Sequence, residues 1–517
     1  MKKSYKVYPN YIKVYPTSEY YNELVELLTK RHQKAVRDYY DTRTRSWKFR
    51  KDWVSEPLYK VGSDNSLEIS QGFTRLLPAK YQELFKLDTL NLTYPEIDMD
   101  LDRVRKVLNS FDLRPDQISA VMKALLFKRG TIQAGTGCGK SAMMAAICKL
   151  LVEENPDIKI LVLEPTLVLV GDMLKFFNEN DIKSIDYKTY LTSDDKNYNV
   201  LITHPKSILT NLESNILGKI QAVMWDECQH VGCNTYTTVN SYLDYAEVSI
   251  GFSALVVQED HIYSPLSELT YEEALVLGCS GPIIFHAPPS YYIESGILST
   301  PYVFQIQYEI PSYLKQQFDY TKLSAGVRKD QVRQLIINES ISQFVELGRR
   351  VLVLVPTKQL AYDLSSQLLA NYDYTSILSF GSNQGYIVDP IRQVKFMKNA
   401  PTEFNDNDDY QIMIATSHLD EGVDLKKLDV VILAAGGKSS RRLVQRIGRI
   451  LRLSKSGKYA YVVDFTDEGN PILVKHRNER LRIYKDELGM DESQIYDNIL
   501  PQQISGIVQQ LEGLGNL

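Results

Sequence analysis

The glycine-rich stretch at residues 131–141, TIQAGTGCGKS, constrains the fold more than any other feature of the chain. It follows a short apolar run and precedes a helix-like run, SAMMAAICKLL, so it predicts a loop that joins a strand to a helix. Glycines at alternate positions allow successive backbone N–H groups to turn toward an anion. A loop of this kind predicts an α/β domain on a parallel sheet, with nucleotide phosphates held at the loop.

The residue types of this loop predict a site for ATP with Mg²⁺. Lys140 would place its ammonium between the outer phosphates, and Ser141 would give a hydroxyl ligand to Mg²⁺. Upstream, Gln117 stands just before an expected helix, where a side-chain amide can read an adenine edge. The predicted nucleotide-binding residues of this half are Arg114, Gln117, Gly135, Thr136, Gly137, Cys138, Gly139, Lys140 and Ser141.

A pair of carboxylates, Asp226 and Glu227, ends the apolar run at residues 222–225. We expect Asp226 to hold Mg²⁺ together with Ser141, and Glu227 to orient or deprotonate an attacking water. Such a pair at a strand end is otherwise a solvated pair or a helix cap. Its place downstream of a phosphate loop favours the catalytic interpretation.

The segment RRLVQRIGRILR, residues 441–452, predicts a helix with arginines at three-residue spacing. An arginine from a second domain would stabilise the charge that develops in phosphoryl transfer. The alternatives are a solvated basic helix or a DNA-binding one. The predicted catalytic residues are Lys140, Asp226, Glu227, Gln445, Arg449 and Arg452.

A second polar loop, residues 415–425, lies between two apolar runs in the same half of the chain. Thr416 stands where a hydroxyl can meet a phosphate backbone, and Gly422 and Asp424 are expected to shape a turn beside the nucleotide. Most clusters of this kind are ordinary turns.

Short apolar runs alternate with helical patterns in two successive stretches of the chain, which is typical of buried parallel strands. We therefore predict an α/β fold of two tandem units, each a parallel sheet flanked by helices, after a small N-terminal α+β domain. The expected domains are 1–100, 101–315, 316–490 and a C-terminal helical tail at 491–517. The predicted strands lie at 160–166, 199–205, 222–227, 248–254, 350–357, 374–381, 411–417, 429–436 and 459–465.

Charge is distributed unevenly along the chain, which carries a net charge of −5 over 517 residues. Residues 1–60 are basic, and aromatic side chains such as Trp47 and Trp53 stand among the charges. Basic groups neutralise phosphates and aromatic rings stack on unpaired bases, although a solvated charged face over an aromatic core is the plainer alternative. The predicted nucleic-acid contacts here are Arg43, Arg45, Lys48 and Arg50.

The five cysteines form no CxxC pair, and no run of eighteen apolar residues or apolar leader is present. These features predict a cytoplasmic protein, within a bacterial host cell if a phage encodes it, with neither structural zinc nor a membrane span.

Taken in order, the segments LRPDQ, AGTGCGKS, DECQH, GFSAL and QRIGRILR resemble the motifs of superfamily 2 helicases. The resemblance implies two RecA-like domains and ATP hydrolysis that nucleic acid stimulates. It also implies that Thr166 in EPTLVLV and Thr203 in THPKSIL contact the backbone of one strand. Leu255 stands where the coupling motif GFSAL is expected to continue with Thr or Ser.

Within this superfamily the chain is most similar to phage UvsW-type recombination and repair helicases, through FTRLLPAKYQELF and GPIIFHAPPSYYIESGIL. That resemblance implies a monomer that remodels branched DNA in recombination, repair or replication, with recombination or single-strand-binding proteins as partners. Two alternatives stay open, a duplex translocase or RNA remodeller, and an ATP-switched DNA-binding subunit that does not unwind.

Overall fold

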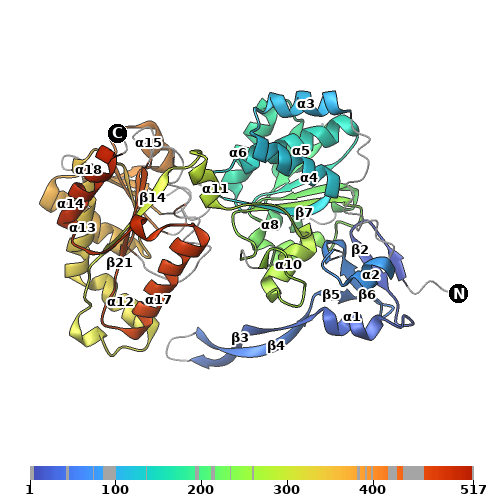
Figure 1. Cartoon of the computed structure of the whole chain (residues 1–517), viewed down its shortest axis with the longest axis horizontal. Coiled ribbons are helices and arrows are strands. Elements are labelled where there is room, and N and C mark those ends of the chain that lie inside the picture. The colour runs from blue at the N-terminus through green and yellow to red at the C-terminus, as the bar shows by residue number, and fades with distance from the viewer. Residues whose placement is uncertain are drawn as a thin grey trace. The chain divides into compact units, whose positions relative to one another are not determined.

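The chain folds into two compact units in a computed structural model (Figure 1). The first comprises Met1–Ala134 and Gly139–His286, and the second comprises Gly135–Cys138 and Ala287–Leu517. The structure describes residues 5–41, 46–73, 75–84, 100–135, 137–192, 197–210, 216–232, 234–258, 261–380, 385–389, 393–397, 400–416, 425, 428–434, 447 and 459–514.

A small antiparallel sheet with strand order β1-β2-β6-β5 opens the first unit. Alternate residues of β2 and β6 are buried, including Ile12, Val14, Leu67 and Ile69, as expected for strands with one face on a core. Two helices accompany this sheet, which confirms the predicted N-terminal α+β arrangement. Its elements are β1 Tyr5–Val7, β2 Tyr11–Val14, α1 Tyr21–Leu27, β5 Tyr59–Val61, β6 Leu67–Ser70 and α2 Ala79–Leu84.

Two long strands, β3 Thr29–Asp41 and β4 Ser46–Pro57, pair antiparallel from Thr29↔Pro57 to Asp41↔Ser46. Among the described residues they form a sheet of their own, which we call the β3–β4 ribbon. In Figure 1 the ribbon projects from the small N-terminal sheet as a narrow blue arm.

The larger sheet of the first unit has the strand order β13-β7-β12-β11-β8-β10-β9 in the part of the chain that is described. Strands β7 to β12 pair in parallel, and β8, β10 and β11 are buried along their whole length. Burial on both faces explains why these strands are continuous apolar runs in the sequence. The strands are β7 Arg129–Ala134, β8 Ile160–Leu163, β9 Ser184–Asp186, β10 Val200–Thr203, β11 Ala222–Trp225, β12 Val248–Ser253 and β13 Ile283–Ala287.

Helices cover this sheet, and α7 begins directly after β9. They are α3 Leu101–Ser110, α4 Pro115–Phe127, α5 Lys140–Glu154, α6 Leu167–Glu179, α7 Tyr187–Thr192, α8 Pro205–Leu209, α9 Asn234–Asn240 and α10 Tyr271–Ser280. Helix α10 and the start of β13 lie in a connector, residues 258–285, whose pattern predicted neither. No helix among the described residues is long and apolar enough to cross a membrane.

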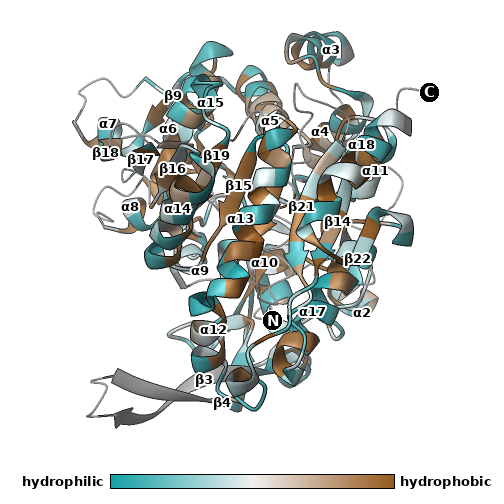
Figure 2. Cartoon of the chain, turned by 90° about the vertical axis from the view of Figure 1, so that its left-hand side faces the viewer, coloured by the Kyte–Doolittle hydropathy of each residue, from teal (hydrophilic) through white to brown (hydrophobic). Residues whose placement is uncertain are grey.

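The second unit is built on a sheet with described strand order β18-β17-β16-β19-β15-β20-β21-β14-β22. Its central strands are parallel, whereas β16, β17 and β18 pair antiparallel at one edge. Figure 2 shows hydrophobic strands such as β15 and β16 beneath helices of mixed hydropathy such as α13 and α14. The strands are β14 Thr300–Ile306, β15 Val351–Leu354, β16 Ser376–Ser379, β17 Gly385–Asp389, β18 Gln393–Met397, β19 Ile412–Ala415, β20 Val430–Leu433, β21 Tyr459–Phe465 and β22 Ile495–Ile499.

Helices of the second unit flank its sheet, so both units have the predicted class, a parallel sheet between helices. All nine predicted strands are present, within a few residues of their expected bounds. The helices are α11 Pro289–Glu294, α12 Tyr320–Lys329, α13 Gln331–Glu346, α14 Lys358–Tyr372, α15 Ala400–Asp406, α17 Pro471–Arg482 and α18 Ile504–Leu514.

Two predicted boundaries need correction. Strand β14 lies before residue 315, yet it pairs with β21 and β22 in the second sheet, so that unit begins earlier than predicted. The expected helical tail also supplies a strand, β22, because the ring of Tyr496 stacks on Phe304 of β14 at 5.5 Å. The acidic linker expected around 88–102 lies mostly outside the described residues, and α3 begins at Leu101.

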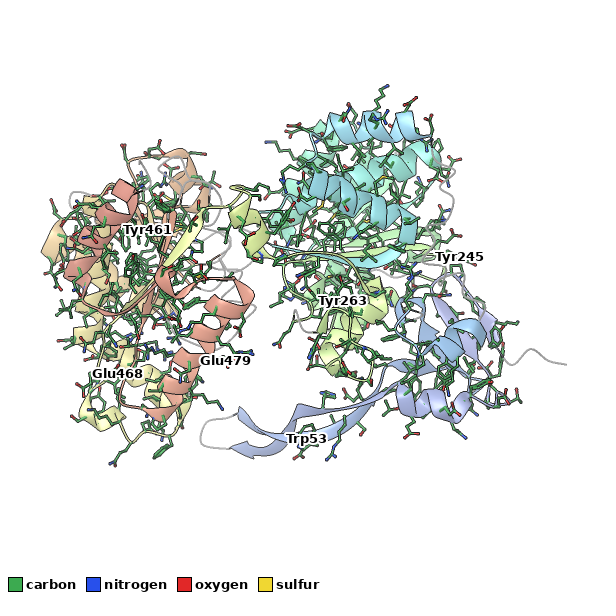
Figure 3. The ribbon with its side chains drawn as sticks, in the orientation of Figure 1. Trp53, Tyr245, Tyr263, Tyr461, Glu468 and Glu479 are labelled. Carbon is green, nitrogen blue, oxygen red and sulfur yellow. The ribbon has the colours of Figure 1, made fainter. Side chains whose placement is uncertain are left out.

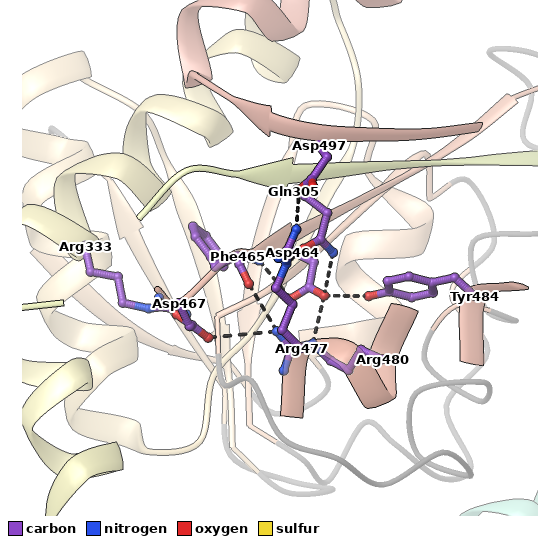
Figure 4. Close-up of polar contacts among 9 residues, drawn as sticks. All are labelled: Gln305, Arg333, Asp464, Phe465, Asp467, Arg477, Arg480, Tyr484 and Asp497. Carbon is purple, nitrogen blue, oxygen red and sulfur yellow. Dashed lines mark hydrogen bonds and ion pairs between the residues drawn. The ribbon is translucent and has the colours of Figure 1, made fainter. Parts of the chain in front are cut away.

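A buried polar network stands at the end of β21 in the second unit (Figure 4). The carboxylate of Asp464 accepts hydrogen bonds from Gln305 Nε2 at 3.0 Å, Arg480 Nε at 2.8 Å and the Tyr484 hydroxyl at 2.8 Å. Its second oxygen accepts from the backbone N–H of Phe465 at 2.8 Å. Helix α17, which carries Arg480, is thereby tied to the sheet.

Candidate active site

The glycine loop joins β7 to α5, as the sequence predicted. Gly137 and Gly139 both have φ of 86°, a left-handed conformation that favours glycine. A Cβ at Gly139 would lie 2.3 Å from the amide nitrogen of Gln117, so α4 packs directly against the loop. Lys140 and Ser141 open α5, and the N-terminus of a helix is a favourable position for an anion.

The predicted carboxylate pair follows β11 and contacts this loop. Glu227 Oε1 accepts a hydrogen bond from Lys140 Nζ at 3.2 Å, and its Oε2 accepts one from Gln229 Nε2 at 2.8 Å. Glu227 has a φ of 45°, an uncommon conformation for a residue with a side chain. Strain of this kind persists where the surroundings fix it, and functional sites are its usual location.

The pKa values of the two carboxylates are shifted in opposite directions. Burial acts to raise the pKa of Glu227, but Lys140 and Gln229 outweigh burial, and its pKa lies below the ordinary value. Burial and the charge of Glu227 raise the pKa of Asp226 to about 6. Glu227 is therefore ionised at neutral pH, as a residue that orients or deprotonates a water must be.

The residues present fit a hydrated Mg²⁺ beside the loop. Asp226 Oδ1 is buried and receives no hydrogen bond within the described part of the chain, so an acceptor stands ready for a cation or its water. Ser141 is exposed at the start of α5, where its hydroxyl can serve as a ligand. Oxygen donors of these two types are those that Mg²⁺ prefers, and bound Mg²⁺ would neutralise phosphate charge.

A chain of hydrogen bonds leads from the carboxylates to the loop after β12. Ser253 Oγ donates to Gln229 Oε1 at 2.5 Å and accepts from the backbone N–H of Leu255 at 3.1 Å. The predicted coupling segment is thus linked through Gln229 to Glu227. Leu255, which departs from the expected Thr or Ser, takes part through its backbone alone.

Gln133, which the sequence interpretation missed, fixes the rest of this loop. Its Oε1 accepts from the N–H groups of Val256 at 2.9 Å and Val257 at 3.0 Å, and its Nε2 donates to the carbonyl of Val257 at 2.9 Å. Gln133 is 1% exposed, one residue before the end of β7. An amide near the end of the strand that leads into the glycine loop was the signal that pointed to it.

Glu164 is a second residue that the sequence interpretation missed. It follows β8 directly and is fully buried in contact with Asp226. Burial, reinforced by the charge of Asp226, raises the pKa of Glu164 well above its ordinary value. Only Thr166 of the segment EPT was singled out from the sequence, although a carboxylate at the end of an apolar run is unusual.

The side chains of the residues predicted to read adenine, Arg114 and Gln117, make hydrogen bonds at the start of α4. Gln117 Oε1 accepts from the backbone N–H of Arg114 at 2.8 Å, as the first turn of α4 requires. The guanidinium of Arg114 pairs with both carboxylate oxygens of Asp116 at 3.1 Å. Both residues stand beside the glycine loop, and adenine recognition by them stays a prediction.

The threonines predicted to contact nucleic acid have different environments in the structure. Thr166 caps α6, with its hydroxyl accepting from the N–H of Leu169 at 3.3 Å, and Thr416 lies half-buried after β19. Thr203 is only 2% exposed, as β10 is buried to its last residue, and its hydroxyl donates to the carbonyl of His204 at 3.3 Å. Contact of Thr203 with a strand backbone stays a prediction. His204 caps α8.

Several predicted residues lie outside the described part of the chain, namely Arg43, Arg45, Thr136, Gly422, Asp424, Gln445, Arg449 and Arg452. Lys48 and Arg50 belong to β4, but no position is assigned to their side chains. Among the described residues, no group of three or more His, Cys, Asp or Glu is placed to hold a metal directly.

The two α/β units and the Lys140–Glu227 site define a nucleotide-dependent motor protein. A family model described as the res subunit of type III restriction enzymes matches residues 110–258, and one described as the helicase conserved C-terminal domain matches 330–454. The chain is an ATP-dependent helicase of superfamily 2.

Among curated relatives, a protein of the Sulfolobus islandicus filamentous virus that is named as a helicase is 24% identical over 74% of this chain and 68% of its own. The DNA 3'-5' translocase XPB2 of Sulfurisphaera tokodaii is 22% identical over 70% of this chain and 83% of its own. The helicase IRC3 of Saccharomyces cerevisiae is matched over only 55% of its length, at 22% identity.

Solved structures agree on the fold. S. cerevisiae Dbp5 bound to RNA and ADP BeF3 matches 78% of this chain and 98% of its own, with 15% identity and a TM-score of 0.51. The crystal structure of T4 UvsW matches 93% of this chain and 96% of its own. Its identity is 17% and its TM-score 0.39.

Proposed function

We propose that this helicase hydrolyses ATP with Mg²⁺ to move along DNA, and that it remodels forks or junctions in recombination, repair or replication. The observation that supports the branched-DNA part is the attachment of the β3–β4 ribbon to the first RecA-like domain. A basic and aromatic arm that is fixed to a motor domain moves with it and can act on a strand or junction that the motor encounters.

The base of the ribbon is tied to the segment that leads into α10. The ammonium of Lys30 donates to the carbonyls of Leu266, Ser267 and Leu269, the last two at 3.0 and 3.1 Å. The ring of His32 stacks on Tyr271 of α10 with centroids 4.2 Å apart. These contacts are polar and directional, so they fix the angle at which the ribbon leaves the domain.

The ribbon offers nucleic acid an exposed ring beside a cation. The side chain of Trp53 is 60% exposed, and the Arg31 guanidinium lies 5.2 Å from the centre of its ring (Figure 3). An exposed indole stacks on an unpaired base, and arginine neutralises phosphate. Unpaired bases occur where duplex and single strands meet, which is why a fork suits this arm.

The roles proposed for the nucleotide site follow from its contacts. Lys140 would bind the outer phosphates and leave Glu227 free to hold the attacking water. Ser141 and Asp226 would hold Mg²⁺, while Arg449 and Arg452 would neutralise charge in the transition state. The contact of Gln229 with both Glu227 and Ser253 would carry the state of the nucleotide to the loop after β12.

The first experiment measures ATP hydrolysis with single-stranded, duplex and forked DNA and with RNA, using Lys140→Ala as the inactive control. The proposal expects the largest stimulation from forked DNA and at least about a 10²-fold loss in the variant, as for a lost transition-state donor. Stronger stimulation by RNA would replace the proposal with an RNA remodeller. No stimulation by any nucleic acid would favour an ATP-switched binding subunit.

A second variant isolates the ribbon. Trp53→Ala is expected to reduce stimulation by forked DNA while basal hydrolysis stays unchanged, since one stacked base contributes about 1–3 kcal/mol. Tyr245→Ala is the matched control, because Tyr245 is 61% exposed in the same unit but lies off the ribbon (Figure 3). Equal effects of the two variants would argue against a specific role for the ribbon.

A further inference from the structure

We infer that Glu164 is a third carboxylate of the metal site, which receives water ligands of the nucleotide-bound divalent cation beside Asp226. This inference rests on the proposed Mg²⁺–ATP site and adds a residue that lies outside the glycine loop and the Asp226–Glu227 pair. In this role Glu164 is a positioning residue, because it acts on the cation through water.

The register of the sheet places Glu164 next to Asp226. Leu163 of β8 pairs with Trp225 of β11, so the residues that follow them stand side by side at the carboxyl edge. The backbone fixes this arrangement, with Asp226 N–H donating to the carbonyl of Leu163 at 3.0 Å and Glu164 N–H donating to that of Thr203 at 3.0 Å. Both carboxylates therefore belong to the edge at which parallel sheets bind ligands.

Apart from a side-chain hydrogen bond with Asp226, Glu164 has no donor among the described residues. Its side chain is fully buried, and neither Oε1 nor Oε2 receives a hydrogen bond from an N–H or hydroxyl group of a described residue. Asp226 Oδ1 also receives none, so three such carboxylate oxygens are buried together. Burying an ionised carboxylate without a partner costs several kcal/mol, by roughly the penalty known for buried ions, and a cation from outside the chain would offset that cost without the proton that the two carboxyl groups otherwise share.

A hydrated divalent cation supplies what these oxygens lack. Mg²⁺ keeps several of its waters in protein sites, and those waters point their hydrogens outward as donors. Direct chelation by the described residues is disfavoured, since no group of three carboxylate, His or Cys ligands is placed for it. Glu164 also interacts electrostatically with Glu227 and Lys140, so it belongs to the same centre.

A purely structural role would require a different environment. A carboxylate that stabilises a fold is paired, as Glu273 is through its capping of α10, where Oε2 accepts from the N–H and hydroxyl of Thr270 at 2.8 and 2.9 Å. Glu273 is 6% exposed in the same unit and so provides a matched comparison. Glu164 lacks such contacts within the described residues, and its oxygens point to a ligand rather than to the fold.

The test compares nucleotide affinity with and without metal in the full chain. A fluorescent, non-hydrolysable ATP analogue is titrated in EDTA and then at increasing Mg²⁺, and Mn²⁺ binding is followed by electron paramagnetic resonance. Glu164→Gln preserves volume and can donate to Asp226, so the variant is expected to fold. It should require about tenfold more Mg²⁺, as for the loss of an outer-sphere partner, with unchanged affinity in EDTA.

The controls separate this inference from the proposed site itself. Glu164→Asp is expected to recover part of the Mg²⁺ dependence, and Glu273→Gln should leave it unchanged. An unaltered Mg²⁺ requirement in Glu164→Gln, or an equal loss of affinity in EDTA and in Mg²⁺, overturns the role of Glu164. If wild-type protein itself shows no effect of Mg²⁺ on nucleotide affinity, the proposed Mg²⁺–ATP site fails instead.

Discussion

Each unit of this helicase buries a polar cluster at the carboxyl end of a parallel strand, and the two clusters are completed in opposite ways. In the second unit, at the end of β21, both oxygens of Asp464 receive hydrogen bonds from donors of the chain, including Arg480 and Tyr484. In the first unit, after β8 and β11, oxygens of Glu164 and Asp226 receive none within the described residues.

The contrast separates a stabilising network from a ligand site on physical grounds. When every acceptor of a cluster receives a hydrogen bond from the protein, no acceptor remains for a substrate. Such a cluster stabilises the packing of helices and strands. A cluster with surplus buried acceptors either binds a proton more tightly or is completed by a cation and its waters, so it can take up a ligand. The same topological position therefore carries binding in one unit and architecture in the other.

The largest expected effect concerns the completed cluster. Asp464→Asn removes the charge that Arg480 requires and should lower the free energy of unfolding by about 3–5 kcal/mol, as for a broken buried ion pair. The measurement is chemical denaturation followed by circular dichroism, because the three tryptophans, Trp47, Trp53 and Trp225, all lie in the first unit.

Glu492→Gln is the control for that variant, since Glu492 forms an exposed ion pair with Lys485 at 2.8 Å. Solvent screens such a pair, and no shift of the unfolding curve is expected. If Asp464→Asn unfolds like the wild type, the network does not stabilise the second unit. The distinction between a stabilising cluster in the second unit and a ligand-binding cluster in the first would then be wrong.

Much of this architecture could be predicted from local sequence. Buried parallel strands are continuous apolar runs, so all nine expected strands were found, and the glycine loop needs its residues at fixed spacing. Lys140, Asp226 and Glu227 could be singled out from local sequence as well. Lys140 stands at the start of a predicted helix, and the two carboxylates follow a predicted strand.

Features that depend on register between distant strands could not be predicted. The proposed role of Glu164 depends on its contact with Asp226, and the two residues are adjacent only because β8 pairs with β11. The same holds for the pairing of β14 with β22, which moved a predicted boundary and changed a predicted helical tail. The burial of Thr203 is a further example, because the sequence does not show how far burial extends along β10.

The second prediction compares two glutamines in equivalent positions, Gln133 of β7 and Gln305 of β14, each one residue before the end of its strand. Gln133→Leu leaves the N–H groups of Val256 and Val257 without an acceptor and loosens the loop that Ser253 begins. A loss of about 1.4 kcal/mol in positioning corresponds to about tenfold in rate, and we expect a loss of that order in DNA-stimulated hydrolysis.

The control in the other cluster is Gln305→Leu, which removes a donor to Asp464. It should lower stability while the ratio of DNA-stimulated to basal hydrolysis stays unchanged. Steady-state ATPase assays with and without DNA measure both ratios. A fall of the ratio in Gln305→Leu as large as in Gln133→Leu would show that the two clusters are not functionally distinct.

The smallest expected effect is a pH dependence of stability that has opposite signs in the two clusters. Burial and the charge of Glu227 raise the pKa of Asp226 from 3.8 to about 6, so the folded state binds a proton more tightly than the unfolded chain. Stability of the nucleotide-free protein therefore falls as the pH rises from about 4 to about 6. Burial opposes the pairing of Asp464 with Arg480, but the pairing prevails and lowers that pKa, so stability is lost as the pH falls.

Asp226→Asn tests the first of these signs. The variant should be more stable than the wild type at pH 7, by on the order of 1 kcal/mol, and this gain should largely disappear below about pH 3.8, where Asp226 is protonated in both the folded and the unfolded state. Unfolding in EDTA is followed by the fluorescence of Trp225, which is fully buried and directly precedes Asp226. The gain should disappear with Mg²⁺ and ATP, because only the wild type gains stability from the ligand. A variant with the wild-type pH profile would mean that Asp226 is not strained, and that the first unit's cluster is complete without a cation.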